Sequence, residues 1–234
     1  MGRFFILLLF HVMVNPLAAQ QKIHVLVITG GHDYDTSAFN RMWDEMPGMS
    51  WELVVQPIAN QWIAAGRLER FGALVFYDMY DSISSDEQMG YVNLVKQKKP
   101  MIFLHHSLAS YQRWPEFKEI VGGRYHTLDG QRVSNYHHDQ WMNIFINNPK
   151  HPVTSGLQNY RIFDETYGQV EIRPDIQPLL TTDHPLSMPT VGWINSYQGH
   201  DIIYLQGGHG PEAFKDHNFR QILAQTIRWS VYRR

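Results

Sequence analysis

Three histidines follow apolar runs in this chain, and their repeated placement is the feature that points most directly to chemistry. They are His32, His105 and His209, which follow the runs 23–29, 101–104 and 202–206. Short runs rich in β-branched and aromatic residues, bounded by glycine or polar residues, are typical of buried strands. The carboxyl ends of parallel strands meet at one edge of a sheet, where open α/β sheets bind ligands. We therefore expect the three imidazoles to line one pocket.

Clustered histidines have two chemical uses at such an edge. Neutral imidazoles and carboxylates bind Zn²⁺ or a similar divalent ion, and imidazole also exchanges protons near neutral pH. The candidate metal ligands are His32, His105, His126 and His209. The chain has no H-E-x-x-H or comparable metal motif, so this prediction depends on convergence in space. An activity that needs neutral imidazole should fall as the pH drops through about 6–6.5.

The residues that position these histidines alternate between predicted strands and predicted helices. The predicted strands are 23–29, 51–56, 73–77, 101–104, 190–195 and 201–206, and the predicted helices are 36–46, 84–99 and 217–228. Ser84 and Glu87 form a capping box at the start of the second helix. This order predicts a single α/β domain with a mainly parallel sheet of five or more strands and helices on both faces.

The alternation stops between about Arg124 and Asp175, and residues from about Arg124 to Tyr167 form the expected lid. Two alternating runs, 131–136 and 141–146, flank His137-His138-Asp139-Gln140. This pattern predicts a β-hairpin whose turn is solvated. Long excursions in α/β proteins tend to carry function. We therefore expect an inserted lid region that brings His126 and Glu165 over the sheet edge towards His105.

Composition excludes several classes of protein. The 234 residues are 44% hydrophobic and 18% charged, which is typical of a globular domain. The chain has 20 basic and 22 acidic residues with no block of like charge, which argues against nucleic acid or an anionic membrane as the main partner. Cysteine is absent, which excludes a disulfide framework, a lipoprotein anchor and a thiol nucleophile.

The first nineteen residues are typical of a secretory signal peptide. Arg3 gives a basic start, 4–14 is apolar, and Leu17-Ala18-Ala19 predicts cleavage after Ala19. The apolar run is too short to span a bilayer. We therefore expect a mature domain of residues 20–234, exported without a membrane anchor, with the periplasm as its destination.

A series of short motifs then identifies a resemblance. The motifs are Thr29-Gly30-Gly31-His32-Asp33, Phe103-Leu104-His105, Trp114-Pro115-Glu116-Phe117, Val121-Gly122-Gly123-Arg124-Tyr125-His126, His151-Pro152-Val153-Thr154-Ser155-Gly156-Leu157, Asp164-Glu165-Thr166-Tyr167, Pro189-Thr190-Val191-Gly192-Trp193 and Gly207-Gly208-His209-Gly210. In this order they resemble the ThuA-like family, named for trehalose utilisation, across nearly all of the mature chain. The resemblance implies the flavodoxin-like, three-layer α/β fold of class I glutamine amidotransferases. In related amidotransferases the turn after the central strand carries a nucleophilic Cys, and His105 takes that place here, so Cys-dependent amidotransfer is excluded.

The resemblance also implies a function in carbohydrate catabolism. Family members are associated with sugars that partner dehydrogenases oxidise to 3-keto derivatives, so we expect a lyase or hydrolase acting on keto-glycosides. Elimination of the glycosidic bond needs a base for the C–H beside the carbonyl, an electrophile on the carbonyl and an acid for the leaving oxygen. The candidate catalytic residues are His105, Glu165, His209 and Tyr167. The candidate substrate-binding residues are Gly31, Asp33, His106 and Trp193.

Two other functions stay open on the sequence. The first is a carbohydrate-binding protein with this fold and no activity. The second is a serine hydrolase that uses Ser107, although the surrounding residues lack the G-x-S-x-G motif. Neither Gly30-Gly31 nor Gly207-Gly208 fits a phosphate-binding pattern, so we expect no nucleotide cofactor. The expected partner is a small carbohydrate, and the sequence does not indicate an oligomeric state.

Overall fold

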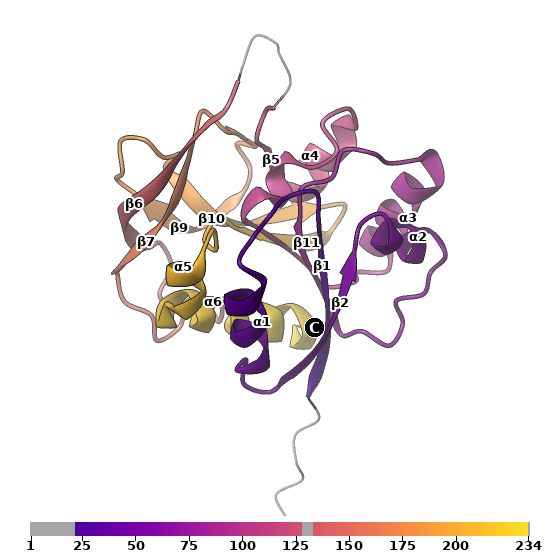
Figure 1. The fold of residues 1–234 in the computed structure, drawn as a ribbon, viewed down its shortest axis with the longest axis horizontal. Helices are drawn as coiled ribbons and strands as arrows, with labels where there is room; N and C mark the ends of the chain where they lie inside the picture. The colour runs from indigo at the N-terminus through magenta and orange to yellow at the C-terminus, as the bar shows by residue number, and fades with distance from the viewer. Residues whose placement is uncertain (1–21, 128–132, 234) are drawn as a thin grey trace, which may run out of the picture.

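The computed structural model describes residues 22–127 and 133–233, which are organised by a nine-stranded mixed sheet (Figure 1). Its strand order is β2-β1-β3-β4-β11-β10-β9-β6-β7. These strands are β1 (Ile23–Gly30), β2 (Met49–Val55), β3 (Ala73–Asp78), β4 (Met101–Leu104), β6 (Asn135–Ile146), β7 (Tyr160–Gly168), β9 (Gln177–Thr182), β10 (Thr190–Tyr197) and β11 (His200–Leu205). Two short strands, β5 (Gly123–Arg124) and β8 (Glu171–Ile172), pair separately. The predicted signal peptide, residues 1–19, lies outside the described residues.

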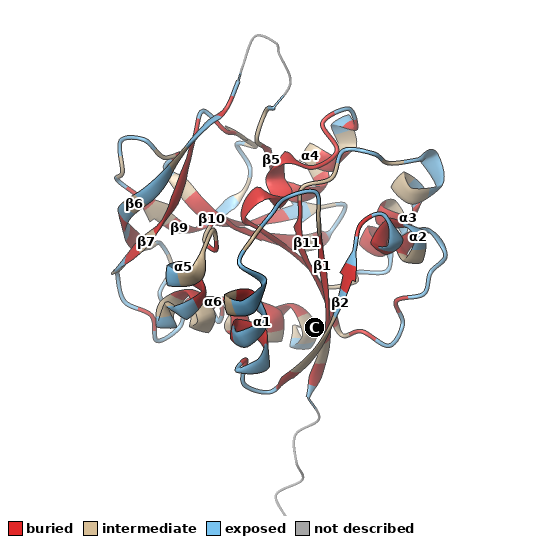
Figure 2. Cartoon of the chain, viewed as in Figure 1, coloured by how far each residue is buried: buried red, intermediate tan, exposed pale blue. Residues whose placement is uncertain are grey.

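One half of the sheet is parallel and contains all but one of the predicted strands. The strand predicted at 190–195 is β10, which pairs antiparallel with β11 and β9. β1 pairs in parallel with β2 and β3, β3 with β4, and β4 with β11. The strands predicted at 23–29, 101–104 and 202–206 are therefore parallel and end at one edge, as expected. They are buried along nearly their whole length because helices cover both faces (Figure 2).

The helices form the outer layers of a three-layer sandwich. They are α1 (Thr36–Asp44), α2 (Ile58–Ala64), α3 (Ser85–Lys96), α4 (Pro115–Val121), α5 (Pro211–Lys215) and α6 (His217–Tyr232). α1, α5 and α6 pack together on one face, while α2 and α3 pack together and α4 contacts β10 and β11 (Figure 1). The capping box predicted at Ser84 and Glu87 is present at the start of α3. Among the described residues, no helix has the length and apolar character needed to cross a bilayer.

The other half of the sheet is antiparallel and corrects two expectations. The predicted hairpin with a turn at 137–140 is wrong, because β6 runs unbroken from Asn135 to Ile146. The polar residues instead form a β-bulge, where the pairing with β7 shifts between His137 and Gln140 and Asp139 takes a positive φ of 57°. A bulge uses the same polar residues as a turn, so the sequence pattern did not separate them. Most of the expected lid is β6 and β7, which extend the sheet itself.

Candidate functional site

His105 stands at a sharp turn where β4 ends. Its φ of 50° lies in the left-handed region, which non-glycine residues rarely adopt, and a short 3-10 turn, η1 (His105–Ala109), begins at this residue. The side chain is fully buried, and Nδ1 lies 2.8 Å from the carbonyl oxygen of Gln206. Because a carbonyl only accepts hydrogen bonds, Nδ1 carries a hydrogen. Nε2 therefore faces the sheet edge, with a lone pair when the ring is neutral and with a second hydrogen when the ring is protonated.

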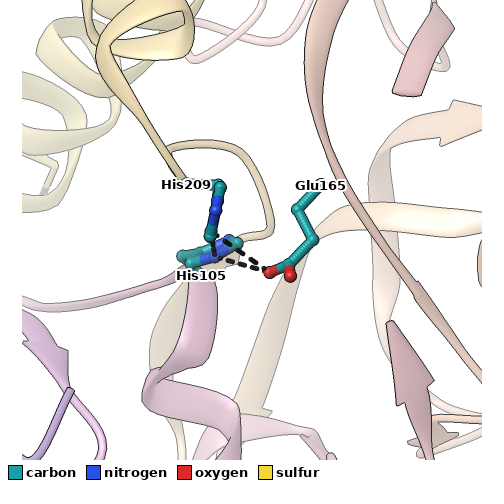
Figure 3. A group of neighbouring side chains, drawn as sticks. All are labelled: His105, Glu165 and His209. Carbon is teal, nitrogen blue, oxygen red and sulfur yellow. Dashed lines mark hydrogen bonds and ion pairs between the residues drawn. The ribbon is translucent and has the colours of Figure 1, made fainter. Parts of the chain in front are cut away.

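Three side chains from distant parts of the chain converge on this nitrogen. Nε2 of His105 lies 3.0 Å from Oε2 of Glu165, on β7, and 3.3 Å from Nδ1 of His209, in the loop between β11 and α5. Nδ1 of His209 lies 3.4 Å from the same carboxylate oxygen (Figure 3). The phenolic oxygen of Tyr167 is 3.0 Å from Nε2 of His105. The structure thus brings together all four residues predicted to be catalytic.

Hydrogen bonds from β7 fix the loop that carries His209. The buried carboxylate of Asp164 accepts from the backbone N–H of Gly208 at 2.8 Å and from that of His209 at 2.9 Å. The hydroxyl of Tyr77 donates to the carbonyl of Gly208 at 2.8 Å. Since Asp164 and Glu165 are neighbours on β7, one strand both holds the loop and contributes the carboxylate of the site.

The charges at the site follow from burial and these contacts. Burial raises the pKa of Glu165, but the hydrogen bonds and charges of His105 and His209 outweigh it and hold that pKa well below its usual range. The hydrogen bond to Glu165 raises the pKa of His209 against the opposing effect of burial. Burial raises the pKa of Tyr167 well above its ordinary value. At neutral pH the site therefore combines an ionised carboxylate with a protonated phenol.

The same group of atoms could hold a divalent metal ion. His105, Glu165 and His209 each offer one ligand atom, and these atoms lie within 4.8 Å of one another. A tetrahedral Zn²⁺ with bonds of about 2.0–2.1 Å separates its ligands by about 3.3 Å, close to the observed 3.0, 3.3 and 3.4 Å. The bond from Nδ1 of His105 to a backbone carbonyl is also the usual support for a metal-bound imidazole. The donor set therefore fits a metal with an open position for water or substrate.

Two of the predicted metal ligands are not part of this group. His32 is exposed and stacks on His106, with ring centroids 4.5 Å apart, and its Nδ1 contacts the carbonyl of Asp33. Nε2 of His126 lies 2.8 Å from Oε2 of Glu171, so this imidazole already has a carboxylate partner. The expected ligand set is corrected to two histidines and Glu165, because the loops that carry His32 and His126 place them in contact with other partners.

A cavity of about 530 Å³ lies over the group and explains where a ligand could enter. Its lining includes His32, His106, His126, His138, Glu165 and Tyr167. His105 and His209 are not part of this lining and contact it through Glu165, so the expectation that His32, His105 and His209 line one pocket is wrong for two of the three. The predicted approach to His105 therefore holds for Glu165 by direct contact, whereas His126 contacts Glu171 and lines the same cavity as His32.

His138 is a site residue that the sequence reasoning placed in a solvated turn. Its Nδ1 lies 3.0 Å from Oε1 of Glu165, and its ring lies 4.7 Å from that of His209. Half of the side chain remains exposed, so it can reach a ligand in the cavity. The His137-His138-Asp139 run was a signal for it, but only the bulge in β6 shows which histidine faces the site.

Two of the predicted substrate-binding residues have structural roles instead. Trp193 is fully buried, packs against Tyr204 and donates its indole N–H to the carbonyl of Val121 at 2.9 Å, so it cannot act as an exposed sugar platform. Gly31 has a φ of 81°, and a Cβ there would lie 1.8 Å from the carbonyl oxygen of Met79. This glycine is needed for close backbone packing beneath the cavity, where Met79 is a lining residue.

Of the other two, His106 lines the cavity and Asp33 is exposed outside that lining. Burial lowers the pKa of His106 well below its ordinary value, and its Nε2 lies 3.2 Å from the carbonyl of Tyr77. The His106 ring is therefore neutral and donates this hydrogen bond. Ser107 is fully buried and its hydroxyl has no hydrogen-bond partner among the described residues, so it lacks the base and the access that a serine nucleophile needs.

A second buried polar group lies behind the cavity wall, at the end of β3. The carboxyl of Asp78 is 1% exposed and accepts a hydrogen bond of 2.8 Å from Nε2 of Gln56. Gln56 also bonds to Asn60 and to the hydroxyl of Tyr111. No cationic side chain pairs with Asp78 among the described residues, and burial raises its pKa to about 7. Because Met79 follows directly, this group anchors a segment of the cavity lining.

Comparisons with known proteins agree with this architecture. The family model described as "ThuA: Trehalose utilisation" matches residues 21–230. A protein described as ThuA-like from Parabacteroides merdae ATCC 43184 has a similar structure, with a TM-score of 0.74, 16% identity and 90% of each chain covered. Another from Bacteroides uniformis ATCC 8492 gives a TM-score of 0.71 and 18% identity over 94% of this chain and 96% of that chain.

A wider likeness connects the chain to amidotransferase folds. A protein from Thermoplasma acidophilum that is described as a GMP synthase component gives a TM-score of 0.54 at 12% identity, over 89% of this chain and 94% of that chain. At such low identity the likeness concerns the fold alone. No curated protein sequence matches the chain. The expected fold, that of class I glutamine amidotransferases with a flavodoxin-like core, is confirmed.

Proposed function

The chain belongs to the ThuA family, whose theme is carbohydrate utilisation, and from this premise we propose that it is an enzyme acting on oxidised (3-keto) glycosides. The observation that carries the proposal is the convergence of Glu165, His105, His209 and Tyr167 beneath the cavity. An ionised carboxylate, imidazoles and a protonated phenol supply both a proton acceptor and a proton donor. A protein that only bound sugars would have no need for this buried set of ionisable groups.

The reaction that suits these groups is elimination of the glycosidic bond. A carbonyl at the 3-position acidifies the C–H at the 2-position, so a positioned base can remove that proton. We assign this role to His138, which faces the cavity and is oriented by Glu165 at 3.0 Å. The bond from the 1-position to its oxygen then breaks, a double bond forms between the 1- and 2-positions, and the leaving oxygen takes a proton. Tyr167, protonated and in the cavity wall, is placed to supply it.

The metal, if used, would be held by His105, Glu165 and His209, whose donor atoms fit Zn²⁺ or a similar ion. When bound, such an ion acts as a Lewis acid on a carbonyl oxygen. The residues themselves fix the donor set, because His105 is tied to the Gln206 carbonyl and the loop of His209 is tied to Asp164. Hydrolysis of the same bond remains a second outcome for this site, since it needs the same acid and base.

The test is an assay of the purified domain, residues 20–234, on methyl 3-keto-α-glucoside and 3-keto-trehalose, with and without a chelator. We expect turnover, loss of turnover on chelation and recovery on adding Zn²⁺. His105→Ala should lower the rate at least about a hundredfold, and His217→Ala, an exposed histidine on α6, should leave it unchanged. Full activity of a folded His105→Ala variant would contradict the proposal. Sugar binding without turnover would favour the binding-protein alternative.

We also propose that the protein is exported to the periplasm and reaches a small-molecule carbohydrate there. The support is the basic and apolar pattern of residues 1–19 with the predicted cleavage after Ala19. Expression of the full chain in a bacterium, followed by fractionation and N-terminal sequencing, tests this proposal. A mature protein that begins at Gln20 in the periplasmic fraction is expected, and an uncleaved protein in the cytoplasmic fraction would contradict it.

A further inference from the structure

The face of the β6–β7 ladder that carries Glu165 also carries an exposed aromatic pair. Residues 163, 165 and 167 alternate onto one face of β7, because successive side chains of a strand point to opposite sides. Across the ladder, Tyr136 pairs with Tyr167 and Trp141 pairs with Phe163, while the bulge in β6 lies opposite Glu165. The bulge keeps Tyr136 and Trp141 on the same face despite their odd separation. The Trp141–Phe163 pair therefore lies next to the site on its own strand.

Trp141 is exposed and held in a defined orientation. Its exposed fraction is 53%, and its ring centroid lies 5.2 Å from that of Phe163. The guanidinium of Arg161 stacks over the indole at 4.6 Å from the ring centroid. These two contacts fix the indole, and its exposed fraction leaves ring surface open to solvent. Trp141 therefore presents a fixed and partly open aromatic surface beside the site.

The spacing along β7 matches a ligand that extends out of the cavity. Two residues of a strand rise about 7 Å, so the aromatic pair is roughly one sugar ring away from Glu165. Glu165 and Tyr167 line the cavity, whereas Trp141 and Phe163 lie outside its lining. A ring bound in the cavity would therefore place the group attached through its glycosidic oxygen over the aromatic pair.

We propose that Trp141, Phe163 and Arg161 form a subsite for a second pyranose ring, the one released by the reaction. The inference rests on the proposed function for the position of the first ring. The apolar C–H face of a pyranose suits an open indole surface, and Arg161 offers donors to the hydroxyls at the ring edge. The site then prefers glycosides whose leaving group is itself a sugar over glycosides with a small leaving group.

Two α-glucosides test the subsite by binding alone. Trehalose carries a second glucose where methyl α-glucoside carries only a methyl group, so the ratio of their Kd values isolates the second ring. By titration calorimetry, the wild-type protein should bind trehalose about tenfold more tightly, since one stacking contact has roughly this effect. Trp141→Ala should abolish the ratio while leaving the Kd of methyl α-glucoside unchanged, and Trp141→Phe should restore part of it. Tyr232→Ala removes an equally exposed aromatic residue on α6 and should leave the ratio unaltered.

The outcomes separate the subsite from the proposed reaction. A trehalose preference that persists in Trp141→Ala, or equal binding of the two sugars by the wild-type protein, overturns the subsite even if 3-keto-glycosides are turned over. A preference that is lost in Trp141→Ala supports the subsite even if no 3-keto-glycoside reacts, in which case the proposed reaction alone fails. Analytical ultracentrifugation tests whether a second copy of the chain, instead of a sugar, occupies this face. A wild-type dimer that becomes a monomer in Trp141→Ala would assign this face to a second copy of the chain and overturn the subsite.

Discussion

Replacing Asp78 by asparagine should remove one identifiable contribution to the pH dependence of stability. The carboxyl is buried at the end of β3 and has Gln56 as its hydrogen-bond donor. Burial raises its pKa from 3.8 to about 7. A carboxyl whose pKa is higher in the folded state stabilises the fold below its unfolded pKa. That contribution is lost as the pH rises through the folded value, so the window runs from about pH 4 to pH 7.

The magnitude follows from the two pKa values. Each tenfold difference in proton affinity corresponds to about 1.4 kcal/mol, so the folded state loses about 4 kcal/mol across the window. Asparagine keeps an acceptor for Gln56 but adds a buried donor, which costs about 1–3 kcal/mol if it is left unpaired. Asp78→Asn should therefore be less stable than the wild type at pH 4 and more stable, by about 1–3 kcal/mol, at pH 8.

Urea denaturation of both proteins at half-unit steps between pH 4 and pH 8.5 measures this effect. The free energies of unfolding of the two proteins should become equal at a pH within this window. Subtracting one from the other at each pH cancels the contributions of the titrating groups that they share. Asp183→Asn, which changes an exposed carboxyl, serves as the matched control and should run parallel to the wild type. Parallel curves for Asp78→Asn and the wild type would refute the reasoning, because the carboxyl would then titrate alike in both states.

Three further predictions concern the metal group and the backbone beneath the cavity. Glu165→Gln should weaken Zn²⁺ binding to chelator-stripped protein at least about a hundredfold by calorimetry, with His217→Ala unchanged; equal affinity would remove Glu165 from the ligand set. When the pH of the wild-type protein is lowered, Zn²⁺ affinity should begin to fall while the pH is still above 6.5. The reason is that Glu165 raises the pKa of His209, so protons compete with the metal for this ligand at a higher pH. Gly31→Ala should lower the free energy of unfolding by more than about 2 kcal/mol, since its Cβ would meet the Met79 carbonyl at 1.8 Å. Gly66→Ala, at a similar φ of 68° with open space around it, should cost only about 1 kcal/mol, and equal losses would contradict the steric argument.

The sequence predicted the parallel half of the fold because its strands are locally encoded. β1, β4 and β11 are short apolar runs with polar ends, and burial on both faces leaves no other element that suits them. The antiparallel half was less readable, because β6 mixes exposed aromatic and polar residues and contains a bulge. Whether a bulge forms depends on the register of the pairing with the partner strand. The sequence of β6 alone does not specify that register.

The residues of the candidate site also fall into those that local sequence predicted and those that strand pairing places. His105 and His209 were found because each follows a buried strand, and Glu165 and Tyr167 because of the family resemblance. His138 was missed because its orientation depends on the pairing with β7. Trp193 was misplaced because a tryptophan in a strand has the same sequence pattern whether it lies in the core or at a surface, and here α4 covers it.

The number of residues in β6 determines which of its side chains face the candidate site, and the bulge is part of that count. Removing Asp139 would leave His138 alone opposite Glu165 and restore regular alternation, with Tyr136 and Trp141 still opposite Tyr167 and Phe163. Inserting or deleting a residue elsewhere in β6 has no bulge to absorb it, so the side chains on one side of the change would exchange faces. Point substitutions along β6 keep the phase of the strand. Engineering of this region should therefore vary residue types freely on the exposed face and leave the residue count on each side of the bulge unchanged.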